Sequence, residues 1–347
     1  MLAFLLAAAA AATPAQGQRP PDFAVSPEKR EALIQAIEAE LRDKYVFPER
    51  LDEAFGRLRP KWSSADFRKL DHALPLLERM NADLQDVFHD RHLNLSLAST
   101  KPPGMFGDPE KADPKQLEQL QAFERLVHYG VVRAEILPGN VGVLELRNFS
   151  SKSPGQSRAY AAAMTFLGET DALIVDLRQN GGGDGEAVAD LVGYLLDQRT
   201  LLQREELRGV GAREQWSAAT VEGPRYGMTR DVFVLTSKRS FSAAEEFAYD
   251  LQTQKRATIV GEASGGGANH NRFARVAQDF ALSIPYGTVK NAVTGKNWEG
   301  TGVQPDLAVK AEDALKVAHR TAVERRLPKE TDPRRKERLV RLVADLQ

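Results

Sequence analysis

The sequence predicts an α/β protein in which a core built on a largely parallel sheet follows a small helical subdomain. From about Ala122 onwards, short apolar segments of strand length alternate with segments whose apolar residues recur at helical spacing. Between residues 26 and 97 only the helical spacing occurs. With 347 residues and 42% hydrophobic content, the chain is large enough to build one large or two modest domains around a buried interior.

The helical spacing in the first part of the chain predicts helices over 27–45, 51–61 and 70–87. The polar segment 99–116, which contains proline and glycine, is predicted to be a linker or a lid. Because the helical part ends near His92, we expect it to pack against the core and to form one side of a cleft.

Strand and helix alternate regularly in the core. The continuous apolar run 172–177 is typical of a strand buried on both faces. The amphipathic, charged helices at the C-terminus either cap the core or pair with a second subunit in a homo-oligomer. The predicted core elements are strands over 141–149, 173–177, 232–236 and 257–261, helices over 156–167, 186–198 and 242–254, a hairpin of 272–277 with 280–285, and C-terminal helices over 311–324 and 333–346.

The first residues predict an export signal. Residues 2–12 are an apolar run too short to span a bilayer, and Thr13, Pro14 and Ala15 bring small residues where a signal peptidase needs them. An alanine-rich buried helix is the alternative. The absence of cysteine fits export, so we expect a periplasmic or extracellular protein without stable membrane insertion. The predicted division is a signal peptide 1–15, a linker 16–25, a helical subdomain 26–97, a linker or lid 98–121, a core 122–310 and C-terminal helices 311–347.

Charge and motifs disfavour several classes of function. The chain has 47 basic and 48 acidic residues, a net charge of -1, so electrostatics gives no reason to expect a nucleic-acid partner. A dinucleotide fingerprint fails because Glu186 stands where glycine is required, and no phosphate-binding P-loop occurs. His89 and His92 could share a helical face, but no third metal ligand follows at a suitable spacing. We therefore expect neither a metal nor a cofactor.

Ser242 is the candidate nucleophile. It lies between the apolar strand 231–237 and an apparent helix, a position that exposes a hydroxyl beside free backbone N–H groups. The simpler interpretation is a helix N-cap, with Glu245 completing a capping box. In either case Glu246 is expected to be a solvated acid of the first helical turn.

Two glycine-rich segments favour acyl transfer over simple capping. Gly181, Gly182 and Gly183 follow the buried strand 172–177, and glycines leave amide hydrogens uncovered for an oxyanion. The second segment, 297–306, is turn-rich and contains Glu299.

Taken together, these segments resemble the C-terminal processing (tail-specific) serine peptidases, in particular the branch related to the interphotoreceptor retinoid-binding protein and to the tricorn core. The resemblance spans about residues 136–309 in the family's order. It implies a crotonase-like ββα-spiral core without an inserted PDZ module. The matching segments are Val175-Asp-Leu-Arg-Gln-Asn-Gly-Gly-Gly183, Leu235-Thr-Ser-Lys-Arg-Ser-Phe-Ser-Ala-Ala-Glu-Glu246, Ile259-Val-Gly-Glu262 and Trp298-Glu-Gly-Thr-Gly-Val-Gln-Pro-Asp306.

The resemblance implies that Ser242 is the nucleophile and that the N–H of Ala243, with that of Gly182 or Gly183, forms the oxyanion hole. The segment 263–268 contains no lysine, so the family's serine–lysine dyad is not expected.

The tricorn-like branch implies instead His92, in an Asp-x-His turn, as general base, and Glu299 as the carboxylate that orients it. His270 is the best substitute for the base. With His92 near a reference pKa of about 6.5, activity should rise with pH through that value.

The predicted function is that of an exported serine endopeptidase that hydrolyses flexible or unfolded polypeptides through an acyl-enzyme on Ser242. The alternative from another class is a non-catalytic protein that binds hydrophobic ligands such as retinoids or fatty acids. An esterase or amidase would use the same residues and differ only in its leaving group.

Overall fold

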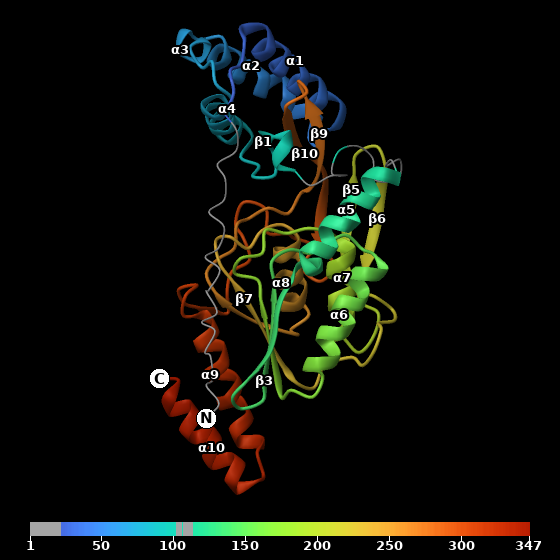
Figure 1. Ribbon diagram of the computed structural model, residues 1–347, viewed down its shortest axis with the longest axis vertical. Helices are drawn as coiled ribbons and strands as arrows, with labels where there is room; N and C mark the ends of the chain where they lie inside the picture. The colour runs from blue at the N-terminus through green and yellow to red at the C-terminus, as the bar shows by residue number, and fades with distance from the viewer. Residues whose placement is uncertain (1–21, 102–105, 107–113) are drawn as a thin grey trace, which may run out of the picture.

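The computed structural model describes residues 22–101, 106 and 114–347 (Figure 1). A six-stranded sheet forms the centre, and all its neighbouring strands run parallel except the pair β2 and β3, which is antiparallel. The α/β prediction is therefore confirmed. In spatial order the strands are β11 (Leu307–Ala308), β8 (Thr258–Gly261), β7 (Asp231–Thr236), β4 (Ala172–Asp176), β3 (Val141–Leu146) and β2 (Val131–Leu137).

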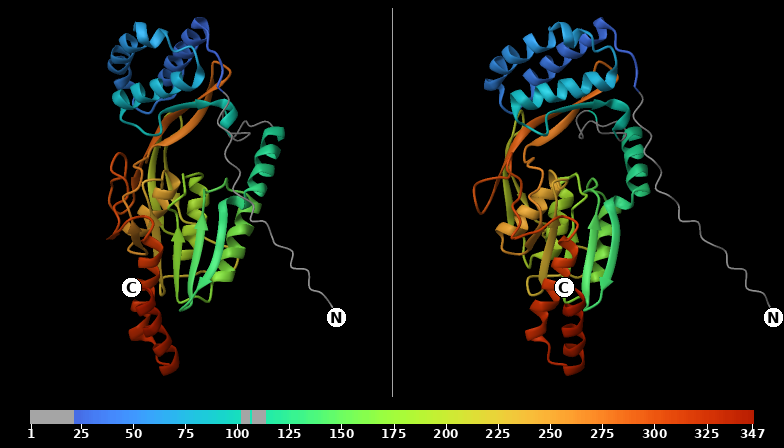
Figure 2. Two further views of the ribbon diagram at one scale, coloured as in Figure 1. Left: turned by 60° about the vertical axis from the view of Figure 1, so that its left-hand side comes forward. Right: turned by 90° about the vertical axis from the view of Figure 1, so that its left-hand side faces the viewer.

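Helices cover both faces of this sheet, which explains why β4 is buried at every residue. Alternate residues of one strand serve opposite faces: Val175 packs towards α6, α7 and α8, whereas Ile174 packs towards α9 and α10. Figure 2 shows the two C-terminal helices beside the sheet and extending below it. The bounds are α6 (Pro154–Leu167), α7 (Gly185–Leu195), α8 (Ala243–Thr253), α9 (Ala314–Arg326) and α10 (Pro333–Asp345).

A second, antiparallel sheet connects the core to the helical subdomain. The predicted hairpin is confirmed as β9 (His270–Val276) and β10 (Phe280–Asn291). β10 also pairs with β1 (Asn94–Leu97) and with β5 (Leu201–Leu207), which in turn pairs with β6 (Gly211–Trp216). The hairpin β5–β6 was not predicted, because its inward positions include Gln203 and Glu205 and so hide the alternation of apolar and polar residues.

The helical subdomain packs over the tip of the β9–β10 hairpin (Figure 1). Its helices share one apolar cluster with β1, β9 and β10, so the hairpin belongs to the interior of this subdomain as well. The helices of this subdomain are α1 (Pro27–Lys44), α2 (Leu51–Trp62), α3 (Ala65–Arg68) and α4 (Ala73–Phe88). Short 3-10 helices occur along the whole described chain, at Pro48–Arg50, Ala98–Thr100, His128–Gly130 and Leu327–Lys329.

The segment predicted as a linker or lid is partly helical, because α5 spans Pro114–Leu126. The proline at its start suits the first helical position, where no N–H partner is needed. The rest of the predicted linker, at 102–105 and 107–113, lies outside the described residues. So do the predicted signal peptide 1–15 and residues 16–21 of the segment predicted to follow it.

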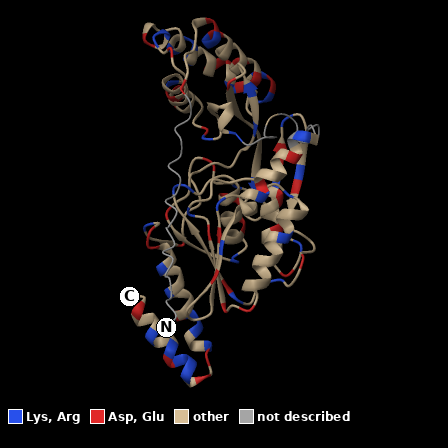
Figure 3. Cartoon of the chain, in the orientation of Figure 1, with Lys and Arg blue, Asp and Glu red and all other residues tan. Residues whose placement is uncertain are grey.

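Charged residues of both signs are interspersed over the helices, whereas the central strands are mostly uncharged (Figure 3). Of the helices in the described ranges, none has both the length and the apolar character that a bilayer crossing requires.

Candidate active site

Ser242 lies where the chain turns from β7 into α8, and its backbone is strained there. Its φ of 56° and ψ of -122° lie outside the regions that a residue with a Cβ ordinarily adopts. A simple N-cap residue has extended dihedrals instead. This conformation is that of a sharp strand-to-helix elbow, which projects a nucleophile from the end of a sheet.

The glycine turn after β4 packs directly against Ser242. A Cβ added to Gly182, whose φ is +108°, would lie 2.8 Å from the Ser242 Cβ, so no other residue fits without displacement. The Gly182 N–H donates to Asn180 Oδ1 at 2.8 Å. The N–H groups of Gly183 and Ala243, in contrast, donate to no acceptor in the part of the chain that the structure describes.

The Glu245 carboxylate holds the turn together. It accepts hydrogen bonds from the N–H of Ser242 (2.8 Å), from Ser264 Oγ (2.6 Å) and from the N–H groups of Gly266 (2.6 Å) and Gly267 (2.9 Å). Burial raises the pKa of this carboxyl, and the hydrogen bonds oppose the rise. Glu245 thus caps α8, as the sequence suggested, and also ties the loop 264–267 to the Ser242 turn.

His92 lies beside this turn, on the loop between α4 and β1. Its ring packs against Phe241 with 4.6 Å between the ring centroids, and a Cβ on Gly267 would lie 2.7 Å from its Cε1. The side chain of Asp90 fixes the loop by accepting the His92 N–H at 2.9 Å. The imidazole is buried, and neither of its nitrogens has a hydrogen-bond partner among the described residues. Burial, with a contribution from His270, lowers its pKa to about 4, so the ring is neutral at physiological pH.

Glu299 lies next to the same loop. Its Oε2 accepts the N–H groups of Ala268 (2.6 Å) and Asn269 (3.1 Å), while its buried Oε1 has no partner among the described residues. Asn269 also donates its side chain to Asp90 at 2.9 Å, which links the Glu299 and His92 loops. Burial and then the negative charge of Asp90 raise the pKa of Glu299 to about 7.

Three remote stretches of chain thus converge around Ser242. In the described residues no hydrogen bond joins His92 to Ser242 or to Glu299, so the three side chains are gathered but not aligned.

A small polar pocket of about 80 Å³ opens beside Ser242. Gly183, Ala243, Glu246 and His270 contribute to its walls, whereas His92 does not.

The prediction of Glu246 as a solvated acid is wrong. Its side chain is buried and accepts a hydrogen bond from Gln215 Nε2 at 2.8 Å. Ser242, Glu246 and Asp250 recur at every fourth residue and share one helical face, but polar residues in that pattern do not reveal burial.

The remaining histidines have structural surroundings. His89 ends α4 in a left-handed conformation, His72 lies 3.2 Å from Asp22, and His319 Nε2 lies 2.8 Å from the Pro138 carbonyl. Over the described ranges, no group of three or more histidine or acidic side chains is arranged to hold a metal ion.

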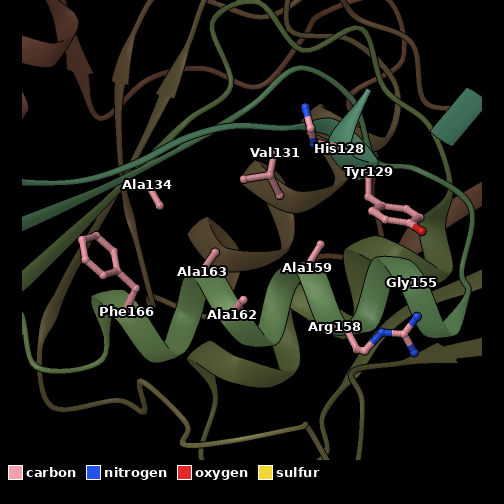
Figure 4. A pocket seen from close by; sticks show the side chains of 10 residues that line it. All are labelled: His128, Tyr129, Val131, Ala134, Gly155, Arg158, Ala159, Ala162, Ala163 and Phe166. Carbon is pink, nitrogen blue, oxygen red and sulfur yellow. The ribbon is translucent and has the colours of Figure 1, made fainter. Parts of the chain in front are cut away.

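A larger, mostly apolar groove of about 640 Å³ lies elsewhere, between α6 and β2 (Figure 4). It shares no lining residue with the pocket beside Ser242. The figure shows alanines of α6 along its floor, with Phe166 at one end and Tyr129 and Arg158 at the other.

Comparison with known proteins gives two matching families. Peptidase family S41 matches residues 140–309, and the N-terminal domain of peptidase S41 in eukaryotic IRBP matches residues 27–138. A carboxy-terminal-processing protease of Bartonella bacilliformis is 27% identical over 49% of this chain. A carboxyl-terminal-processing protease of Synechocystis is 29% identical over 43% of it. The matched stretches cover only 39% and 34% of those relatives.

Two solved structures share the fold. A putative peptidase from Parabacteroides merdae superposes with a TM-score of 0.54 at 18% identity, and covers 83% of this chain and 92% of its own. A lipoprotein from Streptococcus agalactiae has a TM-score of 0.56 at 14% identity, and covers 87% and 99%.

Proposed function

Because this chain belongs to peptidase family S41, we propose that it is a serine endopeptidase that cleaves flexible or unfolded polypeptides. One observation carries the proposal: Ser242 adopts a strained elbow conformation against a glycine turn that offers N–H groups without partners. Such strain is retained where a reaction uses it.

The chemistry follows from the positions of the groups. The Ser242 hydroxyl attacks the substrate carbonyl carbon as its proton passes to the neutral imidazole of His92. The oxyanion that forms is stabilised by the N–H groups of Ala243 and Gly183. Gly183 is the preferred donor, because the Gly182 N–H is already bonded to Asn180. Gly182 contributes instead by letting the serine approach.

Collapse of this intermediate breaks the peptide bond, leaves an ester on Ser242 and releases the amine with the proton from His92. Water then hydrolyses the ester with His92 again acting as base. Glu299 orients the imidazole once its Oε1 and a ring nitrogen, both without partners in the described residues, come together. An extended substrate that adds a strand to a sheet edge would give loose sequence preference.

The finer assignments belong to the same proposal. We propose the crotonase-like spiral for the core, on the basis of the parallel strands and covering helices, and a chain without a PDZ insert. Export to the periplasm or the exterior rests on the apolar run 2–12. The C-terminal helix α10, which exposes Val340, is the candidate surface for a homo-oligomer.

Incubation of a denatured polypeptide with the protein, followed by mapping of the new termini, tests the proposal. Wild type should generate new termini and Ser242→Ala should generate none, while both retain the same melting temperature. Undiminished cleavage by Ser242→Ala would exclude this residue as the nucleophile. A panel of matched esters and peptides would separate an esterase from a peptidase.

The second candidate function, binding of an apolar ligand, has support from the groove between α6 and β2. Its volume falls in the range of small-molecule sites and its walls are mostly apolar. A non-catalytic carrier would bind a fluorescent fatty acid there and cleave nothing, and Ala162→Trp in the groove should abolish that binding.

A further inference from the structure

We propose that the pocket beside Ser242 receives the side chain of a substrate lysine or arginine, with the Glu246 carboxylate as its counter-ion. This specificity rests on the proposed peptidase function. It identifies the residue that the enzyme would favour next to the scissile bond, because the pocket opens at the nucleophile itself.

The Glu246 side chain lines the pocket, and so does Gly185. Gly185 packs closely on that carboxylate, because a Cβ added there would sit 2.9 Å from Gln215 Nε2 and 3.3 and 3.4 Å from the two carboxylate oxygens of Glu246. Position 185 therefore admits no side chain of its own beside the carboxylate.

Acidic groups outnumber basic ones around this carboxylate. Asp250 lies one turn further along α8, and Glu205 of β5 is fully buried. Against these three acids stand His270 of β9, whose Nε2 lies 3.1 Å from Glu205 Oε1, and Arg213 of β6, which is half-exposed and paired with Glu205. With all three carboxyl groups ionised, negative charge exceeds positive charge, and an added cation would reduce the excess.

Hydrogen-bond acceptors are also in surplus. The Oε1 atoms of Gln203 and Gln215 are buried and accept no hydrogen bond from any residue the structure describes. Gln215 donates its Nε2 to Glu246 and to the Gly185 carbonyl, and both of these residues line the pocket. Buried acceptors without donors are costly. A lysine ammonium brings three donors and an arginine guanidinium five.

The size of the pocket and the protonation of its acids agree with a slender cationic guest. About 80 Å³ is the volume of roughly three waters, which suits the end of a slender side chain better than a ring. Burial raises the pKa of Glu246 to about 8 and that of Asp250 to about 7, so the empty pocket holds protons that an entering cation would displace.

The test is a binding measurement on Ser242→Ala, which cannot turn over its ligand. Two peptides that differ only in lysine against norleucine at the same central position are titrated by calorimetry or NMR. We expect the lysine peptide to bind at least tenfold more tightly. Adding Glu246→Gln should reduce the preference to less than twofold. Glu214→Gln, which removes an exposed carboxylate next to Gln215, should preserve it.

Equal or tighter binding of the norleucine peptide would overturn the inference, whether or not the Glu246 variant folds. A second readout needs no variant at that position. Lysine affinity should rise between pH 6 and pH 9 as Glu246 loses its proton, whereas norleucine affinity should stay flat. A lysine affinity that is independent of pH would also contradict the assignment.

Failure of this inference is distinguishable from failure of the proposed function. Cleavage without a preference for lysine or arginine beside the scissile bond would support the proposed peptidase function and contradict the specificity for basic residues. Selective binding of lysine by a protein that cleaves no peptide would support the assignment of the pocket and contradict the proposed peptidase function.

Discussion

The serine side and the histidine side of the candidate site are built differently. Ser242 and the glycine turn follow the ends of β7 and β4, the two central strands, and Glu245 ties the Ser242 turn to the loop 264–267 with four hydrogen bonds. His92 comes from a loop of the helical subdomain, and its ring nitrogens are unbonded within the described chain. The comparison teaches that the proposed nucleophile and oxyanion donors are held in place, whereas the proposed base would have to move to become aligned with them.

The largest expected effect comes from substituting His92, the proposed base. His92→Gln should lower kcat/KM for a peptide by about 10³-fold or more, because the serine loses its base. The melting temperature should stay the same or rise, since the ring nitrogens of the buried imidazole have no hydrogen-bond partners among the described residues. His270→Gln is the matched control. If it is the variant that loses activity while His92→Gln does not, His270 is the base.

A smaller loss is expected on the rigid side from Gly182→Ala. The added methyl group would clash with Ser242 and Phe241, and the residue would retain a φ of +108°. We expect about a 10²-fold loss of activity, with roughly 1–3 kcal/mol of lost stability. Gly181→Ala is the control, because a Cβ there meets nothing within 4 Å. Equal effects of the two substitutions would show that the close approach at position 182 is unimportant.

The dependence of activity on pH tests whether Glu299 acts together with His92. Below pH 7 the buried Glu299 carries a proton and cannot stabilise the imidazolium, and above it the carboxylate can. Activity should therefore rise up to about tenfold per pH unit through pH 7. The pH–activity profile should lack the rise near pH 6.5 that a solvent-exposed histidine would give, because burial lowers the pKa of His92 to about 4. Glu299→Gln should flatten the profile; an unchanged profile in that variant would remove Glu299 from the mechanism.

The smallest effect should come from removing a hydrogen bond between the His92 loop and the core. The Arg91 guanidinium donates to the Gly265 carbonyl and so tethers the His92 loop to the core. Arg91→Met keeps much of the side-chain length but removes the donor. We expect kcat to change only a few-fold while KM stays constant. Arg79→Met, in helix α4 but paired with Asp83, should change neither constant.

Much of the fold was predictable because its strands carry strong local patterns. The run 172–177 is apolar at every position but Asp176, and the hairpin segments 272–277 and 280–285 are mostly apolar and are separated by Gln278 and Asp279. β5 and β6 were missed because Gln203, Glu205 and Gln215 are buried polar residues, whose inward direction depends on partners elsewhere in the chain. The helix α5 was missed because a polar sequence with proline resembles a linker.

The candidate residues were suggested by sequence motifs, but their geometry was not. The sequence could not choose between Gly182 and Gly183, because the choice depends on Asn180 turning its side chain onto one N–H. It also could not show that Glu246 is buried, since this follows from Gln215 on a hairpin about 30 residues away.

The central claim is that Ser242 is an activated nucleophile, and covalent labelling tests it most directly. A fluorophosphonate probe is incubated with wild type, Ser242→Ala and His92→Gln, and the modified peptide is identified by mass spectrometry. The account predicts one adduct on Ser242 in wild type, none in Ser242→Ala and much slower labelling in His92→Gln. An unlabelled wild type, or an adduct that persists in Ser242→Ala, would contradict it.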